Sequence, residues 1–252
     1  MRPSGPQVKL GDVSDPERDA AGREARRLTA AVREARDDAA PFAFAGAVAP
    51  TVLALVSREA GWDVLGRGLW WMWLLLALPS VLLAVFLLVG LGRLTRYQRR
   101  REIVLALLGS VWVFSVLGLA VLIAALVVPS GAKMTGAQLL LSGVTVWLGG
   151  VIAFGLAFWE LDCGGPVARA LSREPRRPDF QFPQDENPTL AREDWSPRLW
   201  DYVYTALTNA IAFSPTDVMP LTRPAKGLMA AGSILSSATL VLVTARAVNI
   251  LR

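Results

Sequence analysis

The sequence predicts an all-α integral membrane protein with four to five transmembrane helices and a short re-entrant helix before the last span. Three observations lead to this fold class. Of the 252 residues, 53% are hydrophobic and only 19% are charged, whereas soluble domains average about 25% charged. The apolar residues gather in long blocks without Asp, Glu, Lys or Arg. Tryptophans and arginines flank these blocks, as is usual at membrane surfaces.

The uncharged blocks have the lengths that bilayers require. A helix rises about 1.5 Å per residue, so roughly 20 apolar residues cross the hydrocarbon core. Three blocks exceed this length, a fourth reaches it and the segment 41–57 is marginal. The blocks in question are 69–92, 103–132, 134–159, 227–245 and 41–57. No soluble fold needs several such runs, so we expect membrane spans.

Residues 1–40 form a polar N-terminal tail followed by a helix. Asp15-Pro16-Glu17 is a typical helix start, because Asp caps, Pro suits the first turn and Glu favours the positive end of the dipole. We expect this helix to end near Asp38. A weak heptad seam within it allows two interpretations, self-association or a solvated or membrane-surface helix; its members are Ala21, Ala25, Leu28, Val32 and Ala35.

The N-terminal transmembrane region is expected over 41–128, with an uncertain span at 41–57 and firm spans at 69–92 and 103–128. The span 69–92 begins with a cluster of tryptophans and is followed by five arginines from Arg93 to Arg101. Arginines concentrate in cytoplasmic loops. We therefore predict that the loop 93–102 is cytoplasmic, in a plasma membrane of the bacterial inner-membrane type.

Composition excludes several classes of function. The net charge is +5, but the basic residues adjoin apolar blocks and show no aromatic-interleaved patch, so no nucleic-acid partner is expected. Histidine is absent and Cys163 is the single cysteine, which excludes an internal disulfide, a Cys/His metal site and His-based catalysis. We predict no enzyme activity, no cofactor and no metal. Cys163 is interpreted as a small interfacial residue.

The region 138–252 has a different organisation from the first half. We predict a span at 138–159, a hydrophilic loop at 160–198, a short helix at 200–213, a polar hairpin at 214–222 and a last span at 225–248. The uncharged stretch 202–216 is too short for a comfortable crossing, which favours a re-entrant half-helix. Phe180 and Phe182 in the loop either touch the bilayer surface or pack on the helices.

This order of elements resembles the pore module of the potassium-channel-like, two-helix pore-loop family. The resemblance covers about 138–251. It implies an outer helix that ends at Leu156-Ala157-Phe158-Trp159-Glu160-Leu161-Asp162 and a pore helix at Tyr204-Thr205-Ala206-Leu207-Thr208. The acidic turn after the filter would be Asp217-Val218-Met219-Pro220-Leu221-Thr222. The inner helix would be 225–251, which includes Val243-Thr244-Ala245-Arg246-Ala247-Val248.

The filter itself departs from the family pattern, Thr-x-Gly-Tyr-Gly-Asp. Counting back from Asp217, those places hold Ala212, Phe213, Ser214, Pro215 and Thr216. Without the two glycines, and with a proline that fixes φ, successive carbonyls cannot stack around an ion. We therefore expect no potassium selectivity. The residues predicted to line a pore or bind a ligand are Thr208, Asn209, Ser214, Thr216 and Asp217.

A second interpretation of the polar hairpin stays open. Ser214-Pro215-Thr216-Asp217 is also an ordinary helix start, and Thr222 before Arg223-Pro224 could begin the last helix. Thr208 is often a back-bonded type of residue, whereas Asn209 needs a partner if it is buried. If 93–102 is cytoplasmic and each later block crosses once, the short helix enters from the cytoplasm, opposite to the family. If 202–216 crosses fully, the re-entrant interpretation fails.

The predicted function is a weakly selective cation pathway or a non-conducting relative of such channels. The expected partners are the lipid bilayer, a monovalent cation and further copies of the chain, four of them if a pore forms. The alternative is a structural or partner-binding membrane protein without transport activity. A transporter is less favoured, because no half-helix pair repeats in two halves.

Overall fold

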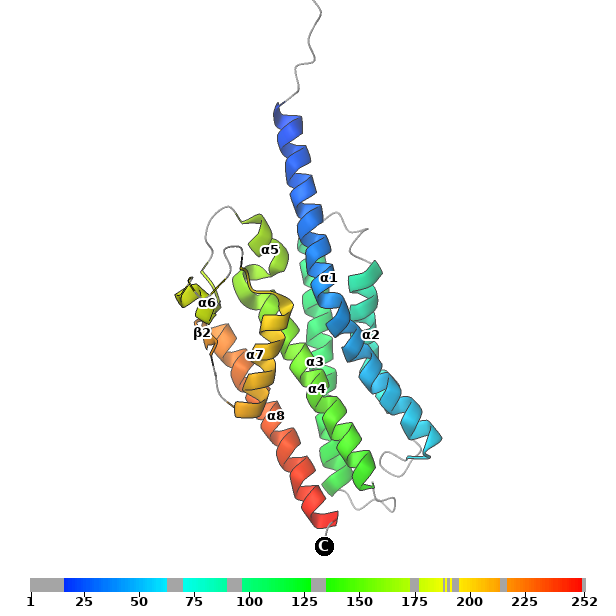
Figure 1. Ribbon diagram of the computed structural model, residues 1–252. Coiled ribbons are helices and arrows are strands. Elements are labelled where there is room, and N and C mark those ends of the chain that lie inside the picture. The colour runs from blue at the N-terminus through cyan, green and yellow to red at the C-terminus, as the bar shows by residue number, and fades with distance from the viewer. Residues whose placement is uncertain are drawn as a thin grey trace, which may run out of the picture.

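The computed structural model describes residues 16–62, 70–89, 97–127, 135–172, 177–187, 189, 191, 195–213 and 217–250, and in this part of the chain the fold is almost entirely helical (Figure 1). One short antiparallel pair joins β1 to β2, with Phe180 opposite Pro220. The elements in chain order are α1 (Pro16–Glu59), α2 (Met72–Val89), α3 (Tyr97–Val127), α4 (Gly136–Leu161), η2 (Asp162–Gly164), α5 (Pro166–Leu171), β1 (Phe180–Gln181), α6 (Pro183–Glu186), α7 (Leu199–Ala212), β2 (Met219–Pro220) and α8 (Arg223–Ile250).

The predicted membrane class is confirmed. Four helical stretches are long and apolar enough to cross a bilayer, namely Gly22–Glu59, Glu102–Val121, Gly136–Leu171 and Arg223–Ala245. Met72–Phe86 in α2 is a shorter apolar helix. Large apolar side chains are exposed along the outside of these helices, among them Ile234 and Val241. Such a surface suits lipid tails and would be costly in water.

The prediction that the N-terminal helix ends near Asp38 is wrong. Helix α1 continues through Pro41 and Pro50 to Glu59, so the uncertain segment 41–57 belongs to the same helix and lies within a candidate span. A proline removes one backbone hydrogen bond and costs about 3 kcal/mol inside a helix. Packing of a buried stripe of small residues compensates this cost, and its members recur at every fourth position: Ala31, Ala35, Ala39, Ala43 and Ala47.

The other predicted elements are found with small shifts in their ends. Helix α3 begins at Tyr97, so part of the arginine-rich loop predicted at 93–102 is helical; residues 90–96 lie outside the described part. Arg is a good helix former, which lets α3 extend beyond its apolar core. Helices α4, α7 and α8 begin and end within three residues of the predicted limits.

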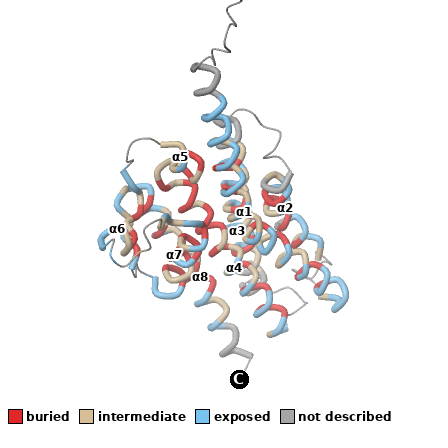
Figure 2. The backbone as a smooth tube through the Cα atoms, turned by 45° about the horizontal axis from the view of Figure 1, so that its top comes forward, coloured by how far each residue is buried: buried red, intermediate tan, exposed pale blue. Residues whose placement is uncertain are grey.

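The long helices α1, α2, α3, α4 and α8 form a bundle, and the shorter α7 packs within it. Helix α7 packs against α4 and α8, and α5, α6 and the β1–β2 pair cover the end of the bundle where α4 finishes and α8 starts (Figure 1). The N-terminal part of α1 extends past the other helices and is mostly exposed (Figure 2). The short elements outside the long helices therefore lie at the bundle end near α5.

The hydrophilic loop after α4 is ordered by its own aromatic residues. Phe180 and Phe182 are buried, and their rings lie 6.2 and 5.2 Å from the ring of Tyr202 on α7. Phe180 also lies 5.1 Å from Phe158 on α4. Of the two interpretations of these residues, packing on the helices is therefore confirmed. This aromatic cluster places the loop against the start of α7.

Candidate functional site

The hairpin that includes α7 and β2 leaves and rejoins the same end of the bundle. Asp201 in the first turn of α7 accepts a hydrogen bond from the backbone N–H of Arg198 at 2.8 Å, which fixes the helix start. At the other end, Phe213 has φ 56 and closes the helix with a hydrogen bond from its N–H to the Asn209 carbonyl. The chain then returns to β2, which pairs with β1. A full crossing by 202–216 is therefore contradicted.

Two hydrogen bonds, one near each end of α7, show how far this helix extends into the bundle. Near its start, the Tyr202 hydroxyl meets Asp162 at the end of α4. Near its end, the Asn209 side-chain amide donates to the Met229 carbonyl at 2.9 Å. Met229 lies six residues after the start of α8 at Arg223, which corresponds to about 9 Å of helix. The tip of α7 lies one further turn down, or about 15 Å from the bundle end.

Glycines allow α7 to lie this close to both neighbours. A Cβ atom on Gly155 of α4 would come within 2.8 Å of the Val203 Cα atom. A Cβ atom on Gly232 of α8 would meet the Asn209 amide nitrogen at 3.3 Å. Close helix approach at small residues is the usual way to pack helices in membranes. The position of α7 is thus set by the shape of two flanking helices.

Asp162 is the centre of the polar network that holds the hairpin. The residue is almost fully buried, at 2% relative exposure. One carboxylate oxygen accepts backbone N–H bonds from Asp179 at 2.7 Å and Phe180 at 3.2 Å. The other accepts the Tyr202 hydroxyl at 2.5 Å and lies 3.5 Å from the Arg169 guanidinium. A buried carboxylate needs such partners, because an uncompensated one is very costly.

Arg169 and Tyr202 complete the surroundings of this carboxylate. Arg169 on α5 also donates to the carbonyls of Trp159 and Asp162, at 3.1 and 2.7 Å. Its guanidinium carbon lies 5.3 Å from the centre of the Tyr202 ring. Burial raises the pKa of the Tyr202 phenol well above its ordinary value, although the nearby Arg169 charge opposes the rise. The hydroxyl therefore stays protonated and remains a hydrogen-bond donor to Asp162.

A second acid ties the returning chain to the same loop. The Thr222 hydroxyl donates to Asp179 at 2.6 Å, and the Leu221 N–H donates to the Asp179 carbonyl at 2.8 Å. Asp179 also accepts from the Cys163 N–H at 3.2 Å. Cys163 has φ 53, a left-handed conformation at the bend after α4. Asp162 and Asp179 together join α4, the loop, α7 and the start of α8.

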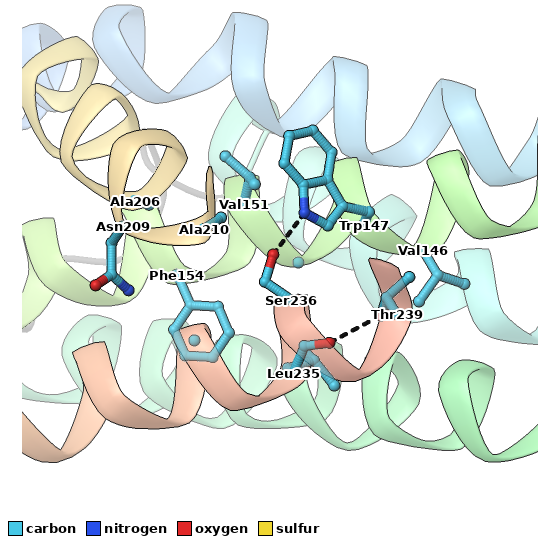
Figure 3. Close-up of a pocket in the computed structure, with 12 residues that line it drawn as sticks. Val146, Trp147, Val151, Phe154, Ala206, Asn209, Ala210, Leu235, Ser236 and Thr239 are labelled. Atoms are coloured by element: carbon cyan, nitrogen blue, oxygen red, sulfur yellow. Dashed lines mark hydrogen bonds between the residues drawn. The ribbon is translucent and has the colours of Figure 1, made fainter. Parts of the chain in front are cut away.

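Deeper in the bundle, the faces of α4, α7 and α8 enclose a small cavity (Figure 3). Its volume is about 10 Å³, close to the minimum for one water molecule. The Trp147 indole N–H donates to the Ser236 hydroxyl across it, and Asn209 and Thr239 also line it. This cavity is far too small for a hydrated ion.

The five residues predicted as pore or ligand contacts fall into three groups. Asn209 is buried and bonded to Met229 and, through its amide oxygen, to the Ser233 hydroxyl at 3.2 Å. Thr208 donates its hydroxyl back to the carbonyls of Tyr204 and Thr205. Asp217 is exposed on the returning chain, whereas Ser214 and Thr216 lie outside the described residues. The structure thus separates Asn209 and Thr208 from the exposed Asp217.

The helix-start interpretation of the polar hairpin applies to Thr222 and not to Asp217. Helix α8 begins at Arg223, and the Thr222 hydroxyl accepts from the Ala225 N–H at 3.4 Å. Asp217 lies at a bend before β2, several residues from that start. The role of Thr222 is therefore confirmed, and a capping role for Asp217 at a following helix is wrong.

Sequence reasoning missed the residues that organise the hairpin. Asp162, Asp179, Arg169 and Tyr202 were not predicted as site residues. The available signal was the position of Asp162 directly after the last turn of an apolar span, where a charged residue needs a partner. Which loop atoms and which tyrosine supply that partner depends on tertiary packing.

Comparison with known proteins gives no relative for this arrangement. No family model matches the chain, and neither a curated protein nor a solved structure matches it. Among the described residues, no three His, Cys, Asp or Glu side chains are grouped so that they could hold a metal ion. Any assignment of function therefore rests on the geometry of the hairpin.

Proposed function

We propose that the chain is a subunit of a pore-loop membrane assembly that provides a weakly selective cation pathway between copies. The observation that carries this proposal is the half-length helix α7, held between α4 and α8, with its return segment at the same bundle end. Its tip lies about 15 Å from that end, near the middle of a hydrocarbon core of about 30 Å. Irregular backbone at that depth is tolerated where it is buried in protein or lines water.

Asp217 is the candidate for the mouth of the pathway. It is exposed, and it is the only carboxylate between Asp201 and the end of the sequence. A ring of acids contributed by several subunits attracts cations and repels anions. The sequence from 212 to 216 lacks the filter glycines, so dehydrated potassium ions would find no stack of carbonyls. Weak selectivity among monovalent cations follows.

The exposed face of α8 is a candidate contact between copies. It carries the exposed Gly227, Ala230 and Thr244 and the half-buried Ser237 beside Ile234 and Val241, at spacings of three and four residues. Small and hydroxyl residues allow close helix packing in membranes, whereas lipid tails gain nothing from them. An assembly through this face would bring the hairpins of neighbouring subunits toward a common axis.

The test is cation flux into liposomes that contain the purified full-length chain. Asp217→Asn removes one charge per subunit, and we expect a several-fold loss of flux that is largest at low salt, where screening is least. Glu186→Gln is the matched control, because Glu186 is an exposed acid on α6 in the same polar region. Equal flux in both variants and the unmodified protein, at normal yield, would remove Asp217 from the pathway.

Selectivity provides a separate prediction. We expect reversal potentials that do not distinguish potassium from sodium, because the carbonyl stack of a potassium filter cannot form without its glycines. The measurement uses liposomes with opposed potassium and sodium gradients. A reversal potential at the potassium equilibrium value would contradict the predicted filter chemistry, while leaving the assembly itself intact.

The second candidate is a structural or partner-binding membrane protein. The observation that favours it is the part of α1 that extends beyond the bundle with an exposed, highly charged surface (Figure 2). The mass of the complex in mild detergent separates the two proposals. A shared pore needs several identical subunits, about four by analogy with the resembled family, whereas a monomer without flux supports partner binding.

A further inference from the structure

A second, larger cavity lies away from the hairpin tip, between α1, α5 and the segment before α7. Its volume is about 190 Å³. The small side chains of Ala31 and Ala35 leave room on the α1 side, and Trp159 and Pro166 form another wall. Four charged side chains also line it: Glu34, Asp38, Arg169 and Arg198. A cavity of this size with convergent charged groups is a candidate ligand site.

The charges around this cavity are of both signs and lie close together. Glu34 and Asp38 are one helical turn apart on α1, so their carboxylates lie on the same face. The Arg198 guanidinium lies 3.3 Å from Glu34 and 3.9 Å from Asp38. The Arg198 and Glu34 side chains are more than 60% exposed. Exposed pairs of this kind are weak and exchange readily with a charged ligand.

An exposed aromatic surface adjoins the charged cavity on its membrane side. Phe42 lies one turn after Asp38 on α1, and its ring is 5.7 Å from that of Trp200 in the first turn of α7. Trp200 is 66% exposed. Tryptophan gathers at the level of lipid head groups. The polar cavity and the apolar surface therefore follow each other in the order of a lipid head and its tails.

We propose that this cavity binds the head group of a phospholipid that carries a primary ammonium and a phosphate diester, as in phosphatidylethanolamine. The ammonium donates hydrogen bonds to Glu34 and Asp38, and the phosphate replaces these acids as the partner of Arg198. The acyl chains lie along Phe42 and Trp200. A purely anionic head group would face the two carboxylates, and a trimethylated amine has no N–H to donate.

The proposed site contacts the start of the hairpin directly. Arg198 is the residue that precedes α7, and its backbone N–H is held by Asp201. Binding of a lipid phosphate to its side chain would therefore act at the point where the hairpin begins. The proposal does not depend on ion passage, because it concerns α1 and the start of α7, away from the hairpin tip, and holds equally for a non-conducting protein.

The experiment uses the purified full-length chain in detergent, titrated with single lipids and observed by native mass spectrometry. The probes are phosphatidylethanolamine, phosphatidylcholine and phosphatidylglycerol with identical acyl chains. We expect phosphatidylethanolamine to bind about tenfold more tightly than the other two, since two charge-assisted hydrogen bonds are lost with them. Equal binding of all three, or preference for phosphatidylglycerol, overturns the proposal.

Variants of the cavity residues test whether the preference for phosphatidylethanolamine arises at this cavity. The double variant Glu34→Gln with Asp38→Asn should bind the three lipids equally, whereas the control Glu24→Gln with Asp37→Asn, at exposed positions of the same helix, should keep the preference. A preference that survives in the first double variant overturns the assignment. Soluble phosphoethanolamine is then added as a competitor. Displacement of the lipid supports recognition of the head group. Failure to displace it at saturating concentration assigns the binding to the acyl chains and overturns the head-group proposal.

Discussion

At the scale of single residues, the buried carboxylate of Asp162 decides where the hairpin lies. It takes hydrogen bonds from two backbone amides and one phenol and is paired with Arg169. The two amides, the phenol and the guanidinium come from three different segments of the chain. An incomplete set would leave a buried charge uncompensated, so loss of any partner should loosen the whole network.

Tyr202→Phe tests this network with a change of one oxygen atom. It removes the hydroxyl that donates to Asp162, and hydrogen bonds to charged groups are worth about 1.5–3 kcal/mol. We expect a lower free energy of unfolding of that size, measured by thermal or denaturant unfolding in detergent. Tyr204→Phe is the matched control, because Tyr204 is exposed two residues along the same helix.

The outcomes of these two variants separate a network role from a general effect of tyrosine loss. Equal stability of Tyr202→Phe and the unmodified protein would show that Asp162 is satisfied without the phenol. Equal destabilisation by both variants would assign the effect to the loss of hydroxyl groups from α7 in general.

At the scale of elements, α7 owes its position to close packing against glycines. Gly155 faces the backbone of Val203, whereas Gly149, less than two turns earlier on α4, has no atom within 4 Å of an added Cβ. The same helix therefore provides one crowded glycine and one open glycine. This contrast allows the packing of α7 to be tested independently of helix propensity.

Gly155→Ala should destabilise the protein, and Gly149→Ala should not. The added methyl group at Gly155 meets a backbone atom that cannot yield without moving α7, and overpacking typically costs about 1–3 kcal/mol. At Gly149 the same change gains helix propensity, up to about 1 kcal/mol. Unfolding in detergent measures both variants. Similar stability changes of the same sign at the two positions would contradict tight docking of α7 on α4.

At the scale of the whole molecule, basic residues are concentrated at one end of the bundle. Helices α3 and α4 run antiparallel, since Trp112 packs on Phe154 and Leu119 clusters with Leu139 and Val146. The start of α3, the end of α4 and the hairpin loop thus share an end with the N-terminal part of α1. Most of the basic residues in the described part of the chain lie there, among them Arg23, Arg26, Arg27, Arg33, Arg36, Arg99, Arg100, Arg101, Arg169, Arg177, Arg198, Arg223 and Lys226.

This distribution predicts the orientation of the molecule in the membrane. Positively charged residues favour the cytoplasmic side, so we expect α1 to begin, and the hairpin to enter, from the cytoplasm. Single cysteines introduced in a Cys163→Ser background at Asp37 and Asn187 should react with membrane-impermeant reagents only after lysis. A cysteine at Ala60, at the other end of α1, should react in intact cells. The reverse pattern would contradict the predicted topology.

The sequence by itself determined the membrane class and most helix positions, because both depend on local properties. A span is predicted where an uncharged run is long enough to cross a bilayer. Pro, Gly and Thr then mark the helix ends within a few residues. The short helix before the last span followed from the same comparison. Thr208 as a back-bonded residue, and Asn209 as one that needs a partner, also followed from side-chain chemistry alone.

Only the tertiary structure decided which partners those residues have and where the chain turns. Local rules predict a helix end before Pro41, yet α1 continues because its alanine stripe is buried against other helices. Asp162 and Tyr202 are 40 positions apart, and Asn209 and Met229 are 20 apart. Such pairs form only when α7 docks between α4 and α8, since hydrogen bonds between distant segments depend on helix packing and leave no periodic pattern in the sequence.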